Sequence, residues 1–401
     1  MAKERGLSMI IFDDGLGKLG PMTDLRAAFE VRTGACTTAH RLATLRSKSL
    51  VGYWVPSRLE AVVRLRANAP VNTLPNEEEM LCVNGRWLTV SAEVDLALGE
   101  ALLEGPTGHV IVARLRRADA EYLLTTGELH ERVRTRTTDQ RELYKYPWDV
   151  VGSFKQTIPA DLHMARMLES TIMDPSDWVV GDESVEIHKS ATVWPGVVFD
   201  ATKGPIRVEQ GATVRPGAIL CGPCAVLRGA TVLDRALIKA NTVIGPMCKA
   251  AGEIGGTVFQ GYANKGHDGH LGDSWVGKWA NLGAGTTNSN LLNTYGDVVV
   301  RTETDGPRHR TGLTFCGAFV GDHVKTAIGT RIMTGTVLGT GAMIASSTPP
   351  PTTVPRFAWL TDDGERVFRL EKFLEVARTV MARRGREPAP AYEARVIALH
   401  G

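Results

Sequence analysis

The chain has little net charge, few cysteines and no long apolar segment. Lys and Arg number 46 against 44 Asp and Glu, and this balance gives no electrostatic basis for binding nucleic acid. No run of about 18 apolar residues predicts a transmembrane helix. Residues 1–14 lack the apolar core of a signal peptide. We therefore expect a cytoplasmic protein that binds neither nucleic acid nor membrane, and whose six cysteines need no disulfide framework.

Two of the cysteines form a Cys-X-X-Cys motif, which runs from Cys221 to Cys224. Redox chemistry at such a motif requires the first thiol at the N-terminus of a helix, where the dipole lowers its pKa. Here the motif lies inside a six-residue repeat, and Cys224 occupies one of the repeat's small-residue positions. We interpret the pair as structural.

Residues 185–345 repeat with a period of six. Small residues recur at every sixth position, and apolar residues recur two positions later. The first sets are Ala212, Ala218, Cys224, Ala230, Ala236, Thr242 and Cys248, with Val214, Leu220, Val226, Val232, Ile238, Ile244 and Ala250. An α-helix of 3.6 residues per turn would scatter these positions, whereas a solenoid of short strands brings them inward. The repeat resembles the hexapeptides of the left-handed parallel β-helix, and its length predicts roughly nine coils.

The rest of the chain divides around this solenoid. Short strands alternating with helical patterns predict an α/β domain, which begins with a strand at Ser8–Phe12 and ends in a turn at Asp174–Asp177. The proline-rich segment Ser346–Pro355 predicts an extended linker, and a helix is expected within residues 363–384. The predicted domains are 1–175 (α/β), 176–348 (β-helix) and 349–401 (linker and C-terminal helix).

The six-residue period is interrupted three times, and solenoid loops at interruptions commonly carry function. The first interruption is at Thr202–Pro205. The second, between Ala250 and Ser274, contains the densest polar cluster of the chain. The third includes the charged segment Leu291–Gly312, which we expect to project from the prism.

The polar cluster resembles the acetyltransferase half of the bifunctional N-acetylglucosamine-1-phosphate uridyltransferase/glucosamine-1-phosphate acetyltransferase family. The matching residues are Gly266-His267, Gly272-Asp273, Gly283–Thr286 and Asn290. The whole chain is closer to a divergent branch of sugar nucleotidyltransferases. Two motifs of that branch, Gly-Tyr-X-Asn-Lys-Gly-His-Asp-Gly and Tyr-Pro-Trp-Asp, appear here as Gly261–Gly269 and Tyr146–Asp149.

The resemblance assigns roles to several residues of this cluster. Acetyl transfer to an amine requires a base that titrates near neutrality, and His267 fits that role. The resemblance implies that Asn290 orients an amino sugar. The resemblance places Arg215 and Lys249 as partners of a sugar phosphate. It also places Asn264 and Lys265 among the substrate-binding residues. Two tyrosines of the family are replaced here by His270 and Leu291, which leaves the substrate's identity open.

The resemblance also implies acetyl-CoA as co-substrate and a homotrimer as the assembly. Acetyl-CoA in these β-helix enzymes lies along the outside of late coils, between neighbouring subunits. The corresponding residues here include Ala318, Gly321, Ala345 and Ser346. Small residues at these positions also suit the corners of any hexapeptide coil, so both interpretations stand.

The N-terminal domain resembles sugar-nucleotide pyrophosphorylases but lacks their charged residues. Gly15, Gly17 and Lys18 match a glycine-rich loop that would cradle a nucleotide phosphate. The family's phosphate-binding Lys falls on Ala27-Ala28. Its Mg²⁺-binding Asp falls on Arg86, which cannot bind the metal. We predict a degenerate nucleotidyltransferase domain that needs Mg²⁺ only if it is active.

The sequence therefore predicts a transferase, and we assign no metal site to it. The leading hypothesis is an acetyl-CoA-dependent N-acetyltransferase acting on glucosamine or galactosamine 1-phosphate, in sugar-nucleotide or cell-envelope biosynthesis. One alternative is nucleotidyl transfer retained in the N-terminal domain. Another is a γ-carbonic-anhydrase-like zinc enzyme using His267, His270 and either His309 or His323. A third is a non-catalytic scaffold that binds sugar nucleotides.

Overall fold

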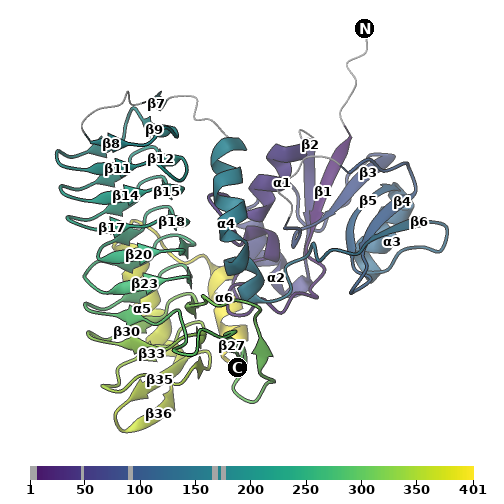
Figure 1. Cartoon of the computed structure of the whole chain (residues 1–401). Helices are drawn as coiled ribbons and strands as arrows, with labels where there is room; N and C mark the ends of the chain where they lie inside the picture. The colour runs from purple at the N-terminus through teal and green to yellow at the C-terminus, as the bar shows by residue number, and fades with distance from the viewer. Residues whose placement is uncertain (1–6, 47–48, 89–93, 165–169, 173–177) are drawn as a thin grey trace.

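A computed structural model describes residues 7–46, 49–88, 94–164, 170–172 and 178–401. It shows an N-terminal α/β domain, a three-sided prism of short strands and two C-terminal helices (Figure 1). This order confirms the predicted fold class. The predicted boundary at residue 175 and the turn at Asp174–Asp177 lie outside the described residues. Among the residues that are described, no helix combines the length and the apolar character needed to cross a bilayer.

The N-terminal domain is a mixed sheet of six strands in the order β2-β1-β3-β5-β4-β6. The predicted first strand, β1 (Ser8–Phe12), is buried along its whole length and pairs in parallel with β2 and β3. The remaining elements are β2 (Ser49–Trp54), β3 (Glu79–Asn84), β4 (Glu100–Glu104), β5 (Val110–Arg116), β6 (Arg134–Thr138), η1 (Ala28–Glu30), α1 (Thr38–Arg46), α2 (Ser57–Arg64), α3 (Arg117–Thr126) and α4 (Pro147–Met164).

Three strand ladders form the sides of the prism, and all their pairings are parallel except β7–β9 and β35–β36. We call them the docked face, the tail face and the third face. The docked face contains β7 (Ser170–Ile172), β9 (Val185–His188), β12 (Ile206–Val208), β15 (Cys224–Val226), β18 (Thr242–Ile244), β21 (Val258–Phe259), β24 (Trp275–Val276), β29 (Ala318–Val320), β32 (Thr336–Leu338) and β34 (Thr353–Val354).

The other two faces complete each coil. The tail face contains β10 (Thr192–Val193), β13 (Thr213–Val214), β16 (Thr231–Val232), β19 (Lys249–Ala250), β22 (Asn264–Lys265), β25 (Asn281–Leu282), β30 (Lys325–Thr326), β33 (Met343–Ile344), β35 (Ala358–Thr361) and β36 (Gly364–Val367). The third face contains β8 (Val179–Val180), β11 (Val198–Asp200), β14 (Ile219–Cys221), β17 (Leu237–Ile238), β20 (Glu253–Gly255) and β23 (His270–Gly272), and a separate pair is β26 (Thr287–Asn288) with β31 (Arg331–Ile332).

The six-residue period places its residues as predicted. The small and apolar sets form one continuous core inside the prism, and Val214, Val232 and Ala250 stack in register along the tail face. Cys224 belongs to this core. Burial raises the pKa of both thiols of the Cys-X-X-Cys motif, the opposite of what a redox site requires, and both cysteines are free. This supports their structural interpretation.

Two expectations about loops need correction. Ser346–Pro355 does not link separate domains, because β34 follows the proline run and pairs with β32, and β35 pairs with β33. The third interruption does not simply project. It forms a hairpin of β27 (Val299–Val300) and β28 (His309–Arg310), and His309 packs on the rings of Tyr146 and Trp148. Aromatic contacts with the N-terminal domain therefore hold this insertion.

The docked face is apolar on its outer side as well as inside. Its central outward residues pair rung by rung along the prism, and they are Ala225, Val243, Val258, Trp275, Phe319 and Val337. All six are buried against the N-terminal domain, where Val151, Phe154, Ile158 and Leu162 of α4 belong to the same cluster. Burial of apolar area on both sides of these strands joins the two domains.

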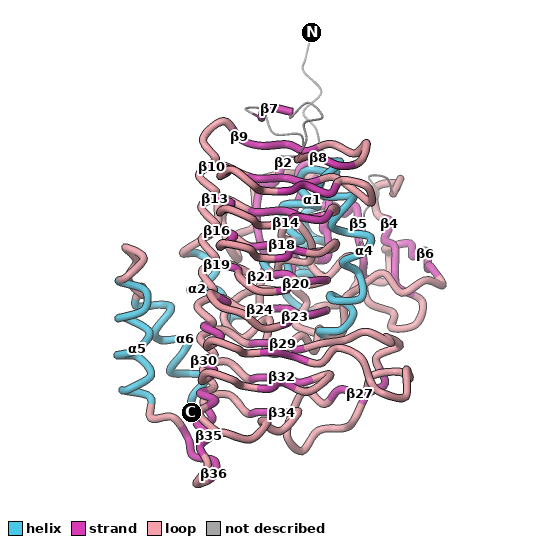
Figure 2. Tube along the Cα trace, turned by 60° about the vertical axis from the view of Figure 1, so that its left-hand side comes forward, coloured by secondary structure: helices cyan, strands magenta, loops and turns pink. Residues whose placement is uncertain are grey.

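The C-terminal helices α5 (Leu370–Ala382) and α6 (Pro390–His400) stand beside the tail face (Figure 2). They also reach the N-terminal domain, since Val396 and Phe373 pack with Leu25. Asp24 is the polar centre of this junction. Its carboxylate accepts hydrogen bonds from Thr340 at 2.7 Å and Arg356 at 2.7 and 2.8 Å, and its carbonyl accepts one from Arg395 at 2.9 Å.

We expect Trp275→Ala to destabilise the junction between the domains. The indole is fully buried and donates from Nε1 to the carbonyl of Arg32 at 3.2 Å. Its loss leaves a cavity worth about 3–5 kcal/mol, which differential scanning calorimetry should record as a melting temperature several degrees lower. Trp178→Ala, which truncates an indole that is 53% exposed, is the control. Equal melting temperatures for the two variants would contradict the role of Trp275.

Candidate functional site

The predicted base lies in a short loop between two faces of the prism. This loop, residues 266–269, connects β22 on the tail face to β23 on the third face. Gly269 has φ +117°, and a Cβ there would lie 2.2 Å from the carbonyl oxygen of Thr286 in the next coil. Only glycine fits such an approach. The loop is therefore pressed against the coil that carries the glycine-rich run.

Lys265 points into the prism and is not available to a substrate. In the tail-face ladder it pairs with Ala250 and Leu282, and it is 1% exposed. Its Nζ donates to the carbonyl oxygens of His267 at 2.8 Å and Asp268 at 3.1 Å. Burial lowers the pKa of Lys265 to about 8. The expected substrate-binding role is corrected to a structural one, because this amine holds the loop from inside.

His267 is exposed at the outer side of this loop. Its imidazole makes no hydrogen bond with any residue in the described part of the chain. Its backbone, however, is fixed through the bond from Lys265. The ring is thus free to contact a ligand while its main chain is held in place.

Asn290 lies in a second cluster, next to the strand that leaves the loop. Its Nδ2 donates to Oδ2 of Asp273 at 2.6 Å. A Cβ on Gly272 would lie 2.6 Å from both Asn290 Nδ2 and His270 Cε1, so these two side chains flank that glycine. His270 Nδ1 lies 3.2 Å from the carbonyl of Asn288. The structure therefore joins Asn290 with His270 and Asp273.

Asp273 belongs to the Gly272-Asp273 match, and the resemblance gave this carboxylate no role. Burial raises the pKa of this carboxyl group, an effect opposed by the hydrogen bond from Asn290 and by the charge of Lys155. Lys155 belongs to α4, so the N-terminal domain contributes charge to this cluster. The Gly-Asp match was the available signal. No sequence pattern indicates that Lys155 of α4 lies near Asp273, because that proximity depends on the packing of the N-terminal domain against the prism.

The predicted phosphate partners are dispersed along the prism. Lys249 is exposed on the tail face, one coil before Asn264. Arg215 lies three coils before the His267 loop, roughly 14 Å along the axis at strand spacing. Its guanidinium covers Trp194 and pairs with Asp234 at 3.2 Å. Within one chain, Lys249 is near the loop and Arg215 is not.

Asn264 is held by the C-terminal segment, since Arg384 donates to its Oδ1 at 2.8 Å.

The expected cofactor residues separate into two kinds. Ala318 and Gly321 are buried, and a Cβ on Gly321 would lie 2.6 Å from the backbone nitrogen of Thr340. Ala345 is exposed and Ser346 half-buried. The expectation that Ala318 and Gly321 contact the cofactor is therefore corrected. They are buried positions where neighbouring coils pack closely.

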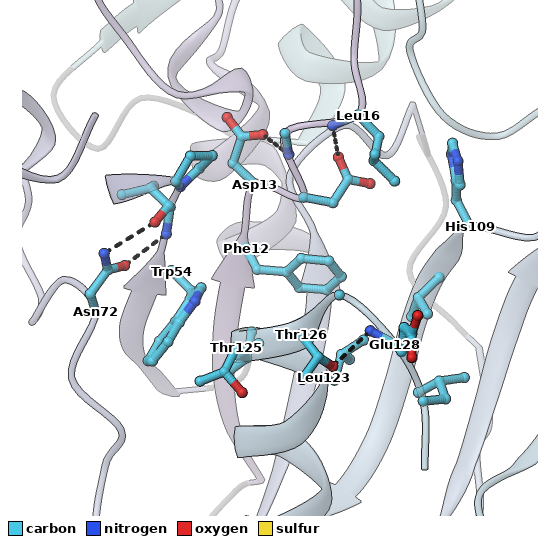
Figure 3. Close-up of a pocket in the computed structure, with 18 of the residues that line it drawn as sticks. Phe12, Asp13, Leu16, Trp54, Asn72, His109, Leu123, Thr125, Thr126 and Glu128 are labelled. Carbon is cyan, nitrogen blue, oxygen red and sulfur yellow. Dashed lines mark hydrogen bonds between the residues drawn. The ribbon is translucent and has the colours of Figure 1, made fainter. Parts of the chain in front are cut away.

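The N-terminal domain holds a cavity of about 840 Å³ at the carboxyl ends of β1 and β2 (Figure 3). Phe12, Trp54, Asn72 and His109 are among its lining residues. Gly15, from the predicted phosphate loop, also lines it. Gly17 and Lys18 instead line a neighbouring hollow of about 720 Å³. The expected loop is therefore divided between two spaces.

A buried ion pair occupies the position expected for metal-binding carboxylates. Arg86 Nε donates to Asp14 Oδ1 at 2.8 Å, and Asn84 Nδ2 donates to Asp14 Oδ2 at 2.8 Å. Arg86 Nη1 also donates to the carbonyl of Tyr144 at 2.9 Å. Hydrogen bonds and charge from Arg86 hold the pKa of Asp14 below its usual value despite burial. These residues do not fit Mg²⁺, because a guanidinium already neutralises the carboxylate.

The zinc alternative is not supported by the placement of its histidines. His323 is buried, and its Nε2 lies 2.8 Å from the hydroxyl of Tyr392. His309 packs against Tyr146 and Trp148. Within one chain, neither joins His267 and His270. Across the described residues, no three His, Cys, Asp or Glu side chains gather as a metal-binding group.

Comparisons with known proteins support the resemblance. A family model described as sugar nucleotidyl transferase matches residues 9–167. The bifunctional sugar-1-phosphate nucleotidylyltransferase/acetyltransferase of Sulfurisphaera tokodaii is 28% identical over 153 residues, 35% of each chain. The bifunctional protein GlmU of Jannaschia sp. is 30% identical over 194 residues, which cover 48% of this chain and 38% of that protein. The chain is similar to GlmU-like proteins as a divergent relative, and it spans little more than a third of the length of these two.

Solved structures show only distant likeness. The acetyltransferase domain of PglB from Neisseria gonorrhoeae, in complex with acetyl coenzyme A, is 14% identical and matches 68% of this chain and all of that domain, with a TM-score of 0.15. The UDP-N-acetylglucosamine acyltransferase of Francisella novicida is 12% identical over 56% of this chain and 78% of its own, with a TM-score of 0.23.

We expect Lys265→Met to loosen the His267 loop without unfolding the prism. Methionine suits an inward position that is apolar in neighbouring coils, but it removes two hydrogen bonds to loop carbonyls. At about 1 kcal/mol each, their loss should speed amide exchange in residues 266–269 by roughly tenfold or more. Hydrogen–deuterium exchange measured by mass spectrometry tests this. Lys249→Met, on the exposed side of the same face, should leave exchange in the loop unchanged, and unchanged exchange in Lys265→Met would contradict the role.

Proposed function

We propose that this divergent relative of GlmU-like proteins is a transferase that moves the acetyl group of acetyl-CoA to the amine of an amino-sugar 1-phosphate. The observation that carries the proposal is the exposed imidazole of His267 on a loop held from inside by Lys265. A general base must reach the amine while its own position is fixed. The sugar would be glucosamine or galactosamine 1-phosphate, and the product would serve sugar-nucleotide biosynthesis in the cytoplasm.

The reaction assigns each group a task. The acceptor's amine attacks the thioester carbonyl, and His267 takes the proton that the nitrogen loses. The C–S bond then breaks, and His267 returns that proton to the leaving sulfur, so coenzyme A departs as the free thiol. Asn290, held by its 2.6 Å bond to Asp273, orients the sugar. Lys249 supplies positive charge to the phosphate from the adjacent coil.

The proposal includes a cofactor and an assembly, and both involve the late coils. Ile328 is 80% exposed, and Met333 and Phe315 are each about half exposed. Exposed apolar side chains of this size can be covered by a neighbouring subunit. Ala345 lies one coil after Ala327, at the matching position. We place acetyl-CoA beside Ala345 and Ser346, between subunits of a homotrimer.

His267→Ala is expected to lower turnover by about 10²–10⁴-fold, the usual contribution of a general base. Release of free thiol from acetyl-CoA is measured with glucosamine 1-phosphate and galactosamine 1-phosphate, and light scattering follows the assembly. His40→Ala, which removes an exposed histidine of α1, is the matched control. Full activity in His267→Ala would refute the base. Binding of sugar nucleotides by a wild type without turnover would favour a scaffold.

We infer a second capacity for the N-terminal domain, which is nucleotide binding without nucleotidyl transfer. The 840 Å³ cavity supports binding, and the Arg86–Asp14 pair argues against a Mg²⁺-dependent transfer.

Two measurements test this second inference. A uridine nucleotide should raise the melting temperature by a similar amount with and without MgCl₂. Wild type mixed with a nucleoside triphosphate, a sugar 1-phosphate and MgCl₂ should release no pyrophosphate. Magnesium-dependent release of pyrophosphate would show that transfer is retained.

A further inference from the structure

A second hollow, of about 340 Å³, lies between the N-terminal domain and the prism. Both domains line it, and its walls carry five basic side chains. They are Arg26, Arg32 and Arg66 from the N-terminal domain, with Arg228 and Lys278 from the prism. Glu30 is the acidic residue among those that line it. None of these residues belongs to the His267 loop or to the nucleotide cavity.

Internal ion pairs neutralise only part of this charge. Arg26 pairs with Asp322, and Glu30 accepts two hydrogen bonds from Arg66, at 2.7 and 2.8 Å. The side chains of Lys278 and Arg228 make no hydrogen bond or ion pair with any residue that the structure describes. Their backbone nitrogens donate to Asp322 Oδ1 at 2.7 Å and to Glu209 Oε2 at 3.0 Å. Glu209 lies near Arg32 but cannot balance three cations. The hollow therefore keeps an excess of positive charge.

Arg32 is held in place by the prism. Its backbone nitrogen donates to Oε1 of Gln260 at 2.7 Å, and its carbonyl accepts from the indole of Trp275 at 3.2 Å. Gln260 also donates from Nε2 to the carbonyl of Glu30 at 2.9 Å. The Nε of Arg32 is buried and has no partner among the described residues. The guanidinium also donates from Nη1 to the carbonyl of Ala35, so it is held at the domain junction without all its donors being satisfied.

Three aromatic rings line the same hollow, Tyr262, Tyr53 and Phe29. Tyr262 stacks on Trp279 with ring centroids 4.4 Å apart, and Tyr53 stacks on Phe29 at 4.9 Å. Tyr262 adopts a positive φ of 56°, which is uncommon for a side chain of this size. Flat aromatic walls with several cations suit a small organic phosphate, because oxyanions take charge-assisted hydrogen bonds from Arg and Lys.

We propose that this hollow binds the phosphate group of a small phosphorylated ligand and so bridges the two domains. The phosphoryl oxygens contact Lys278 and Arg228 on the prism side and Arg32 on the N-terminal side. A ligand held from both sides favours the docked arrangement, so its binding stabilises the junction. The site is separate from the acetyl-transfer site and does not depend on that proposal.

Inorganic pyrophosphate is the probe, and isothermal titration calorimetry on the full chain is the measurement. We expect binding to the wild type and at least tenfold weaker binding to Lys278→Gln, the loss expected for one charge-assisted contact. Arg228→Gln, at the exposed rim, should weaken binding similarly without a risk to folding. Lys203→Gln removes the same charge from an exposed loop and should bind as the wild type does.

The remaining outcomes each decide the proposal. Pyrophosphate should raise the melting temperature of the wild type and have a smaller effect on Lys278→Gln. His267→Ala should bind normally, because the ion does not sit at the acetyl-transfer loop. Three results would each overturn the proposal. They are failure of the wild type to bind, binding by Lys278→Gln and Arg228→Gln that is as tight as binding by the wild type, and loss of binding in His267→Ala.

Discussion

The buried apolar ladder on the outer side of the docked face is the interaction on which the rest of the molecule depends. A β-helix normally needs apolar residues only inside its coils, since its outer surface faces water. Here Trp275 and Phe319, adjacent rungs of the ladder, point outward and are fully buried. They commit one of the three faces to the N-terminal domain. The His267 loop therefore opens between the other two faces, and α4 lies close enough to place Lys155 near Asp273.

This docking also explains which parts of the structure the sequence could predict. The six-residue period identified the inward residues, because burial inside a coil imposes the same requirement on every rung. The outward ladder repeats on only one face in three, so its members lie about 15 to 18 residues apart along most of the chain and form no short pattern. Once the period is known, however, asking which outward positions are apolar would have found the docked face.

The site shows a similar division. The Gly-His and Gly-Asp matches correctly brought attention to residues 266–273, and the Asn290–Asp273 bond joins two parts of the quoted motifs. Lys265 was misassigned because a lysine in a polar loop motif resembles a ligand-binding group. Its strand position, in register with Ala250, directs it inward instead. Arg215 was grouped with the loop by resemblance alone, and strand register separates them. In the N-terminal domain, Arg86 was recognised as unsuited to Mg²⁺, but its pairing with Asp14 required the fold to be seen.

Asp24 adds a constraint of another kind. Its partners Thr340, Arg356 and Arg395 lie 316, 332 and 371 residues further along the chain. A ribosome adds roughly 5–20 residues per second, so this early carboxylate remains without those partners for tens of seconds after it emerges. The hydrogen bond from Arg395 of α6 to Asp24 can form only at the end of that interval. The junction at Asp24 thus couples the packing of the N-terminal domain to segments that are made more than 300 residues later.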